Sequence, residues 1–416
     1  MTGLPEPVEL DDLLEPFAVR GVDLGLERLR TALAAGGNPE AAFPAVQVAG
    51  TNGKGSICTV VHAILRAASL RVGTYRSPHL ISWCERVRLD DRWISPGELR
   101  ADLARWQEIG RRHGLTPFEL LTAAAFDRFA AEAVDLAVLE VGLGGRLDAT
   151  TAHPRRQVLG FGAIGMDHRE HLGSTLAAIA FEKAGVMTPG GVAISGPQEP
   201  EARRVLEERA AELGCRLRWV EPLPAAAAGG PLLGLQGDLQ RSNAAVAAAM
   251  AEELAAQGWP ISETAIRTGL AAARWPGRLE RWQWQGRELL IDGAHNPPAA
   301  AALRQEIDRL DGGGARRWLL GIQRHKDGPA VVGHLLRSGD QAAIVAIADH
   351  ASWSVEELTT ALPQCTGQLR AVSCVAEGLA WLEPAGLLPV VAGSLYLLGQ
   401  VLPLLEPQPQ LEPPQP

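Results

Sequence analysis

The chain has 416 residues, of which 46% are hydrophobic and 21% are charged. This length and composition predict a globular protein of two or three domains with a large buried core. The formal net charge of -9 excludes a broad basic surface that could follow a nucleic-acid backbone. We therefore expect a small-molecule substrate, with the functional lysines and arginines gathered locally in a site.

Signals for secretion or membrane insertion are weak. The first residues are acidic, whereas a signal peptide needs positive charge followed by an apolar stretch. Residues 385–405 are apolar, but Pro389 and Pro403 interrupt them, so we expect a buried strand at 388–391 and a helix at 394–402. The scattered cysteines form no C-x-x-C pair and predict a reducing, cytoplasmic compartment; they are Cys58, Cys84, Cys215, Cys365 and Cys374.

A glycine-rich loop follows the first apolar segment. Residues 45–48 predict a buried strand and residues 56–68 a helix, and the loop at 50–56 joins them. In this context backbone N–H groups and the helix dipole can hold phosphate oxygens, with Lys54 at the terminal phosphates and the Ser56 hydroxyl near a metal ion. The alternative is a glycine-rich turn at an ordinary junction between a strand and a helix.

A carboxylate ends the next predicted strand. A helix at 117–131 precedes a buried strand at 136–141, and Glu140 lies near the carboxyl end of that strand, where open α/β sheets bind ligands. We predict that Glu140 holds Mg²⁺, although a solvated strand-end carboxylate would look the same in sequence. Residues 142–150 then combine flexible glycines with one cation and one anion, a composition that suits a loop closing on a ligand.

Two further side chains extend this candidate site. His168 follows a predicted strand around 158–164, and we predict that it is a metal ligand, although a lone histidine is more often structural. A helix at 174–184, closed by Gly185 in the C-cap position, carries Lys183 in its last turn. Lys183 by itself could also be a favourable cation at the end of a helix.

The alternation of short apolar strands with longer helical stretches predicts an α/β fold, with a mostly parallel sheet covered by helices on both faces. Residues 225–231 resemble a loop, and a second alternating pattern starts near Trp284. We predict a first domain at 1–283, a C-terminal domain at 284–405 and a disordered tail at 406–416. The strands expected in the C-terminal domain are 288–291, 318–321, 343–347 and 388–391.

Longer motifs occur in order along both halves of the chain. The first half carries Gly50-Thr51-Asn52-Gly53-Lys54-Gly55-Ser56, Ser77-Pro78-His79-Leu80, Thr116-x-Phe118-Glu119, the run from Glu140 to Thr150, and Glu182-Lys183-Ala184-Gly185. The second half carries Gln240-x-x-Asn243-Ala244, Gly277-Arg278-Leu279-Glu280, the run from Asp292 to Pro297, Lys326-Asp327 and Gly393-Ser394-Leu395-Tyr396. Together these motifs resemble the folylpolyglutamate and dihydrofolate synthases of the Mur-ligase superfamily.

The resemblance implies a P-loop ATPase domain followed by a Rossmann-like domain that ligates glutamate. It implies that ATP is held by Gly53, Lys54, Gly55, Ser56, Asn243, Arg278 and Asp292. It further implies two Mg²⁺ ions held by Ser77, Glu140, His168 and a Lys183 that has become a carbamate by adding CO₂. The catalytic residues would be Lys54, Lys183 and His295, with His295 near the glutamate.

The resemblance also implies a pterin pocket made by Thr116, Pro117, Phe118, Glu119, Leu147, Asp148 and Ala149. The family commonly has asparagine where this chain has Thr151, and aspartate where it has His325. Thr151 lies beside the expected pterin contacts, so the first departure bears on the choice of acceptor.

The predicted reaction is an ATP-dependent, ADP-forming ligation of L-glutamate to dihydropteroate, to tetrahydrofolate or to both, through an acyl phosphate. The resemblance implies a monomer without nucleic-acid or membrane partners. Three alternatives are a ligase that adds an amino acid to a cell-wall precursor, a P-loop kinase and a non-catalytic nucleotide sensor. The Phe118-Glu119 and Ser77 to Leu80 segments argue against the first, and the 292–297 motif argues against the second.

Overall fold

The structure is a computed structural model that describes residues 4–18, 21–382 and 388–405. It divides into an N-terminal unit, Leu4–Gly234 with Gln240–Arg274, and a C-terminal unit, which takes Leu235–Leu239 and the chain from Trp275 onward. This division lies before the predicted boundary at 283/284. The tail predicted to be disordered, 406–416, lies outside the described residues.

Within the described residues, an eight-stranded sheet forms the centre of the N-terminal unit, in the order β4-β3-β2-β5-β1-β6-β7-β8. The six neighbouring strands β2-β5-β1-β6-β7-β8 all pair in parallel. Strands β3 and β4 add an antiparallel edge beside β2. The predicted strands at 45–48 and 136–141 are confirmed as β1 and β5. The bounds are β1 Ala45–Ala49, β2 Val72–Tyr75, β3 Val87–Leu89, β4 Arg92–Trp93, β5 Leu136–Glu140, β6 Arg156–Phe161, β7 Val192–Ser195 and β8 Arg216–Trp219.

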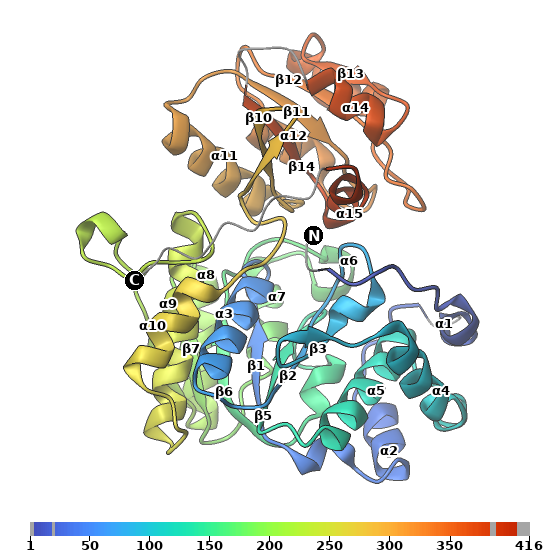
Figure 1. Ribbon diagram of the computed structural model, residues 1–416, viewed down its shortest axis with the longest axis vertical. Coiled ribbons are helices and arrows are strands. Elements are labelled where there is room, and N and C mark those ends of the chain that lie inside the picture. The colour runs from blue at the N-terminus through green and yellow to red at the C-terminus, as the bar shows by residue number, and fades with distance from the viewer. Residues whose placement is uncertain (1–3, 19–20, 383–387, 406–416) are drawn as a thin grey trace. The chain divides into compact units, whose positions relative to one another are not determined.

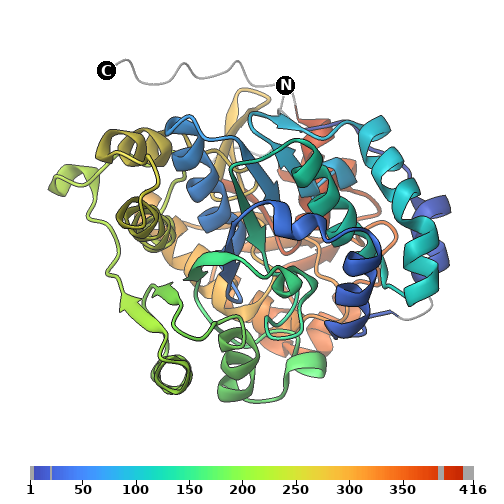
Figure 2. The same ribbon diagram turned by 90° about the horizontal axis from the view of Figure 1, so that it is seen from below.

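Helices cover both faces of this sheet, as the alternating pattern predicted (Figures 1 and 2). Helix α3 packs against α10, and Gly269 of α10 leaves no room for a Cβ against Ile64 of α3. On the other face, Phe126 and Phe129 of α5 share a core with Tyr75 of β2. The helices are α1 Asp11–Ala18, α2 Glu27–Ala35, α3 Lys54–Ala67, α4 Pro96–His113, α5 Pro117–Ala131, α6 Arg169–Leu172, α7 Leu176–Ala184, α8 Pro200–Leu213, α9 Asp238–Ala256 and α10 Glu263–Ala272.

The start of α5 follows from a local sequence signal. Thr116 accepts a hydrogen bond from the N–H of Glu119, and the Glu119 carboxylate accepts one from the N–H of Thr116, which closes a capping box. Pro117 at the first helical position needs no hydrogen-bond partner for its nitrogen. The predicted helix 117–131 is therefore confirmed at both ends.

The C-terminal unit contains a sheet, within the described residues, of six strands in the order β13-β12-β11-β14-β10-β9, and only the β9–β10 pair is antiparallel. Its core includes Trp318 of β11 and Val390 of β14. Its strands are β9 Glu280–Trp284, β10 Arg287–Ile291, β11 Arg316–Leu320, β12 Gln341–Ile344, β13 Leu369–Ala371 and β14 Leu388–Ala392. Its helices are α11 Pro297–Asp311, α12 Gly328–Leu335, α13 Val355–Ala361, α14 Val375–Leu382 and α15 Leu395–Val401.

The apolar stretch near the C-terminus is divided between elements, as its prolines predicted. It contributes the buried strand β14 and the short helix α15. Among the described residues, no helix has the length and apolar character needed to cross a membrane.

Candidate active site

Four neighbouring parallel strands bring the phosphate loop and three of the predicted metal ligands to one edge of the sheet in the N-terminal unit. In the strand order β2-β5-β1-β6, Val48 of β1 lies opposite Glu140 of β5, and Tyr75 of β2 lies opposite Leu139. Ser77 follows β2, the loop at 50–56 follows β1, and His168 follows β6. Because parallel strands end at the same edge, segments that are distant in sequence converge there. The prediction that the strand before His168 shares a sheet with the Glu140 strand is confirmed.

The phosphate loop has the backbone shape that its glycines permit. Gly53 has φ +85° at the N-cap of α3, a left-handed conformation that favours glycine. The N–H groups of Thr51 and Asn52 both donate to the Ala163 carbonyl, at 2.9 and 3.0 Å, and so fix the loop to the chain after β6. In the described chain, no side chain caps this helix, so its first N–H groups can face an anion. The helix begins at Lys54, two residues before its predicted start at 56.

The side chains around the loop are packed closely. Lys54 Nζ donates to the Gly50 and Thr51 carbonyls, at 3.1 and 3.2 Å, so the ammonium lies over its own loop. Asn243 of α9 lies against Gly53, where an added Cβ would be 2.2 Å from Asn243 Oδ1. Asn243 therefore contacts the phosphate loop, and its role as an adenine contact stays a prediction.

Lys183, in the last turn of α7, is a buried cation. Only 4% of its surface is exposed. Burial, reinforced by the charge of Lys54, lowers the pKa of Lys183 to about 7, while Asp167 and Asp148 act in the opposite direction. Because Lys54 contributes to this shift, the phosphate loop and the end of α7 lie within electrostatic reach of each other. An amine with this pKa is partly neutral near neutral pH, as addition of CO₂ requires.

Glu140 is 5% exposed at the end of β5 and has a buried cation nearby. Burial lowers the pKa of Arg76 to about 10, with Glu140 acting in the opposite direction, and Arg76 Nη1 donates to Thr59 Oγ1 at 3.1 Å. Arg76 was missed in the sequence, where it directly precedes Ser77. The signal available was a charged residue directly after a short strand, β2, and directly before the Ser77 to Leu80 motif.

His168 adopts a left-handed backbone, with φ +49°, which is uncommon for a residue with a side chain. Its N–H donates to Asp167 Oδ1 at 2.9 Å, and its imidazole is half-buried, with Nε2 3.9 Å from Asp167 Oδ2. Among the described residues no three histidine, cysteine or acidic side chains form a metal-binding group. The predicted set contains only two such residues, Glu140 and His168, so it reaches a ligand count suited to Mg²⁺ only with the Ser77 hydroxyl and a carbamate oxygen on Lys183.

The loop after Glu140 is closed by Asp148, which is buried. Its Oδ2 accepts from the N–H groups of Gly142 and Leu143, at 3.0 and 2.9 Å, and its Oδ1 accepts from the N–H and hydroxyl of Thr150, at 3.0 and 2.5 Å. Burial raises the pKa of Asp148 while these hydrogen bonds oppose the shift. This geometry supports a role in shaping the loop, and direct contact with the acceptor stays a prediction.

The loop also packs against α7. Arg146 N–H donates to the Glu182 carbonyl at 2.8 Å, and an added Cβ on Gly145 would lie 3.0 Å from Lys183 Cα. Gly185 is the C-cap, as predicted, but its φ is -63° and not left-handed. Glycine is needed there because a Cβ would lie 2.3 Å from Arg146 Cβ. The predicted helix 174–184 begins two residues later than expected, at Leu176, because Thr175 caps it.

The two segments of the predicted pterin pocket meet at Gly142. A Cβ there would lie 2.6 Å from Phe118 Cζ, and the Phe118 ring lies 5.8 Å from that of Tyr75. Phe118 and Leu147 are half-buried, whereas Thr116, Glu119 and Ala149 are buried. Thr151, the departure from the family pattern, is buried and turns inward, because its hydroxyl donates to the Gly145 carbonyl and accepts from Gln47 Nε2, at 2.7 and 2.8 Å.

The C-terminal unit places the remaining predicted residues beside the start of β9 and the end of β10, which are adjacent because these strands pair antiparallel. Asp292 accepts hydrogen bonds from the N–H groups of Leu279 and Ala294, both at 2.8 Å, and so ties the turn before β9 to the turn after β10. Burial raises the pKa of Asp292, and Arg278 opposes that shift. His295 Nδ1 lies 2.8 Å from the Gly293 carbonyl. Arg278, Asp292 and His295 therefore form one cluster, while their roles toward ATP and glutamate stay predictions.

Comparison with known proteins agrees with these motifs. The sequence profile of the C-terminal domain of dihydrofolate synthetase matches residues 278–404. The chain is 30% identical to a probable dihydrofolate synthetase of Schizosaccharomyces pombe over 408 residues, 91% of this chain and 98% of the relative. The chain belongs to the dihydrofolate and folylpolyglutamate synthase family. Members of this family are ligases, so the protein is a ligase.

Solved structures extend the relation to the fold. FolC of E. coli, in complex with DHPP and ADP, has a TM-score of 0.82 and 30% identity, over 96% of this chain and 99% of that chain. A bifunctional folylpolyglutamate synthase/dihydrofolate synthase with Mn, AMPPNP and L-glutamate bound has a TM-score of 0.82 and 30% identity, over 97% and 99%. The α/β fold of this family member, with two mostly parallel sheets, therefore follows that of the family across both units.

Proposed function

We propose that the protein is an ATP-dependent, ADP-forming ligase that joins L-glutamate to the carboxylate of dihydropteroate, of a tetrahydrofolate or of both. The observation that carries this proposal is the convergence of the phosphate loop, Glu140, His168 and Lys183 at one sheet edge, where Lys54 and Lys183 repel each other. Two clustered cations near an uncapped helix N-terminus suit a polyphosphate. Family membership supplies the substrate class.

The first step that we propose is phosphoryl transfer to the acceptor. A carboxylate oxygen of the acceptor attacks the γ-phosphorus of ATP, the bond to the bridging oxygen breaks, and ADP leaves with the electron pair. Lys54 and the N–H groups at the start of α3 offset the charge on the phosphoryl oxygens. Mg²⁺, held at two sites by Ser77, Glu140, His168 and a carbamylated Lys183, would supply further positive charge there.

The second step forms the amide. The α-amine of glutamate attacks the acyl carbon of the acyl phosphate, the carbon–oxygen bond to phosphate breaks, and the amine proton passes to solvent. We propose that Arg278 and Asp292 contact the nucleotide and that His295 orients the glutamate. The half-buried Phe118 ring beside Gly142 would give the pterin an apolar surface.

An assay with purified protein tests the proposal. ADP and phosphate release are measured with dihydropteroate or tetrahydrofolate, with and without glutamate, and the product is identified by mass. We expect phosphate release to require both the acceptor and glutamate. A phosphorylated product that accumulates would instead indicate a kinase, release only with a cell-wall precursor would indicate the other ligase class, and nucleotide binding without turnover would indicate a sensor.

Metal dependence tests the ligand assignment separately. We expect Glu140→Ala and His168→Ala each to raise the Mg²⁺ concentration needed for half-maximal rate, by about tenfold. The exposed Glu221→Ala serves as the control, because Glu221 follows β8 and does not belong to the proposed set. If both site variants keep the normal Mg²⁺ dependence, these residues are not metal ligands.

A further inference from the structure

Arg28, near the start of α2, holds the first turn of α5 in place. Its Nε donates to Glu119 Oε2 at 2.8 Å, and its Nη1 donates to Asp23 Oδ2 at 2.8 Å. Its Nη2 also donates to the Asp23 carbonyl. One guanidinium therefore joins the segment before α2 to the turn that carries Phe118 and Glu119, and it is only one-fifth exposed.

Besides capping α5, the Glu119 carboxylate binds Arg28. Its Oε2 accepts from both Arg28 and the N–H of Thr116, whereas Oε1 is buried without a hydrogen-bond partner among the described residues. An unpartnered buried carboxylate oxygen costs free energy unless a ligand completes it. The neighbouring Phe118 lies against Gly142, in the loop that Asp148 closes.

We propose that Arg28 is a positioning residue for the acceptor substrate: it fixes Glu119 and Phe118 so that the pterin end of the acceptor finds a preformed site. This inference rests on the proposed function. Arg28 does not touch the reacting atoms, so it acts on binding of the acceptor and not on phosphoryl transfer. Arginine suits this position because its planar fork reaches two partners at once, whereas a lysine ammonium on a flexible stem is not held in that geometry.

The test compares Arg28→Met with Arg128→Met in the full chain. Arg128 also lies against a buried carboxylate, because its Nε and Nη2 donate to Asp102 of α4 at 2.8 Å, but Arg128 itself lies in the last turn of α5, at the opposite end of that helix from Glu119. Both substitutions remove a cation that is paired with a buried carboxylate. The Michaelis constants for dihydropteroate, ATP and glutamate are measured together with kcat and the thermal midpoint.

For Arg28→Met we expect the KM for dihydropteroate to rise about tenfold, as for one lost charge-assisted hydrogen bond, while the KM values for ATP and glutamate stay within about twofold. Arg28→Lys should recover part of the loss. Arg128→Met should lower the thermal midpoint and leave the KM for dihydropteroate unchanged. Because Arg28 acts through Glu119, adding Glu119→Gln to Arg28→Met should raise this KM by less than the product of the two single effects.

Three results would overturn the positioning role: an unchanged KM for dihydropteroate in Arg28→Met, an equal rise for all three substrates, or the same rise in Arg128→Met. If Arg28→Met does not fold, Arg28→Lys is judged by the same criteria. Failure of the proposed function is distinct, because the wild-type enzyme itself would then release no phosphate with glutamate and either dihydropteroate or tetrahydrofolate. If the wild type uses only tetrahydrofolate, the same comparison is made with that acceptor.

Discussion

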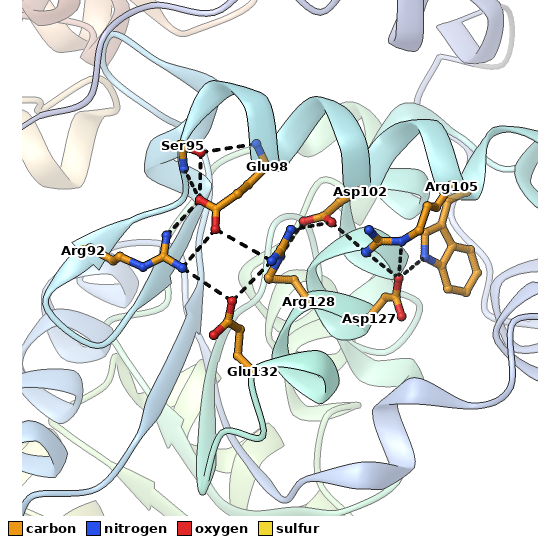
Figure 3. Close-up of polar contacts among 9 residues, drawn as sticks. Arg92, Ser95, Glu98, Asp102, Arg105, Asp127, Arg128 and Glu132 are labelled. Atoms are coloured by element: carbon orange, nitrogen blue, oxygen red, sulfur yellow. Dashed lines mark hydrogen bonds and ion pairs between the residues drawn. The ribbon is translucent and has the colours of Figure 1, made fainter.

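Two groups of charged side chains in the N-terminal unit are arranged in opposite ways. The first, the α4–α5 network, joins carboxylates and guanidiniums in alternation; it consists of Arg92, Glu98, Asp102, Arg105, Asp127, Arg128 and Glu132 (Figure 3). Asp102, 1% exposed, accepts from Arg128 and from Arg105 Nη2, the latter at 2.7 Å. Each buried charge in this network has an opposite charge beside it.

The phosphate site instead gathers positive charges that repel one another. Burial lowers the pKa of Lys183, and the charge of Lys54 lowers it further. Burial also lowers the pKa of Arg76, with Arg88 adding to the shift and Glu140 opposing it. Lys54 donates to backbone carbonyls of its own loop. Positive charge is thus concentrated at the edge of the sheet where we propose that ATP binds.

The paired charges of the α4–α5 network contribute to stability, whereas the like charges of the phosphate site serve ligand binding. Removing one partner from a buried ion pair leaves an uncompensated charge and costs stability. Removing a cation that repels its neighbours relieves that repulsion, and the cost appears only when an anionic ligand must be bound. Substitutions in the two groups should therefore divide cleanly between loss of stability and loss of activity.

The largest effect is expected for Lys54→Ala. Because Lys54 is proposed to act on the transferred phosphoryl group, kcat should fall about 10⁴-fold, a loss typical of a cation that stabilises phosphoryl transfer. The thermal midpoint should stay near that of the wild type, since the hydrogen bonds of Lys54 go to two carbonyls of its own loop and join no other element. Steady-state kinetics and thermal unfolding of the same preparation check both statements, and near-normal turnover would remove Lys54 from the mechanism.

Lys183→Met is expected to lower kcat about 10³-fold by removing a ligand and its charge from the site. Its free energy of unfolding should not fall, because the substitution removes a buried ammonium whose pKa is already lowered. A carbamate needs the neutral amine, whose fraction increases as the pH rises through about 7. When a fixed concentration of dissolved CO₂ is returned to CO₂-depleted wild-type enzyme, the recovered ligase activity should therefore increase as the pH rises through about 7. Full activity without CO₂ would contradict the carbamate.

The sequence allowed the sheet edge to be predicted because the relevant signals are local. Short apolar strands end at Ala49 and Glu140, and parallel pairing then places their ends together whatever the intervening chain does. The start of α5 was predictable for the same reason, since Thr116, Pro117 and Glu119 act within one turn.

Contacts between distant segments could not be predicted from such signals. No local pattern indicates that Arg28 reaches Glu119, that Asn243 packs on Gly53, or that Gly185 is glycine because of Arg146. The antiparallel edge formed by β3 and β4 was also missed, because its strands are only three and two residues long.

Asp102→Ala should have the opposite outcome to the lysine variants. It leaves the largely buried Arg128 without its bidentate partner, so the free energy of unfolding should fall by about 3 kcal/mol. The KM values and kcat at a temperature below unfolding should not change, because the network does not touch the phosphate site. Arg105→Ala removes a half-exposed partner of the same carboxylate and should cost only about 0.5 kcal/mol, as measured by denaturant unfolding. A loss of activity in folded Asp102→Ala would break the division between the two groups.

The smallest effect is expected at the outer end of the network. The hydrogen bonds from Arg92 lower the pKa of Glu98 to about 2, and Glu98 also accepts from the N–H of Ser95 at the start of α4. The pKa of Glu98 is 4.5 in the unfolded state and lower in the folded state, so the ionised carboxylate stabilises the folded state fully above pH 4.5. This stabilisation is lost as the pH falls from 4.5 through about 2. Glu98→Gln keeps an oxygen for the capping box but removes the charge and one of the two acceptors for Arg92, so it should cost about 1 kcal/mol at pH 7. Measured by urea unfolding, the difference from wild type should shrink between pH 4.5 and 2, whereas Glu108→Gln, an exposed change on the same helix, should show little difference at any pH.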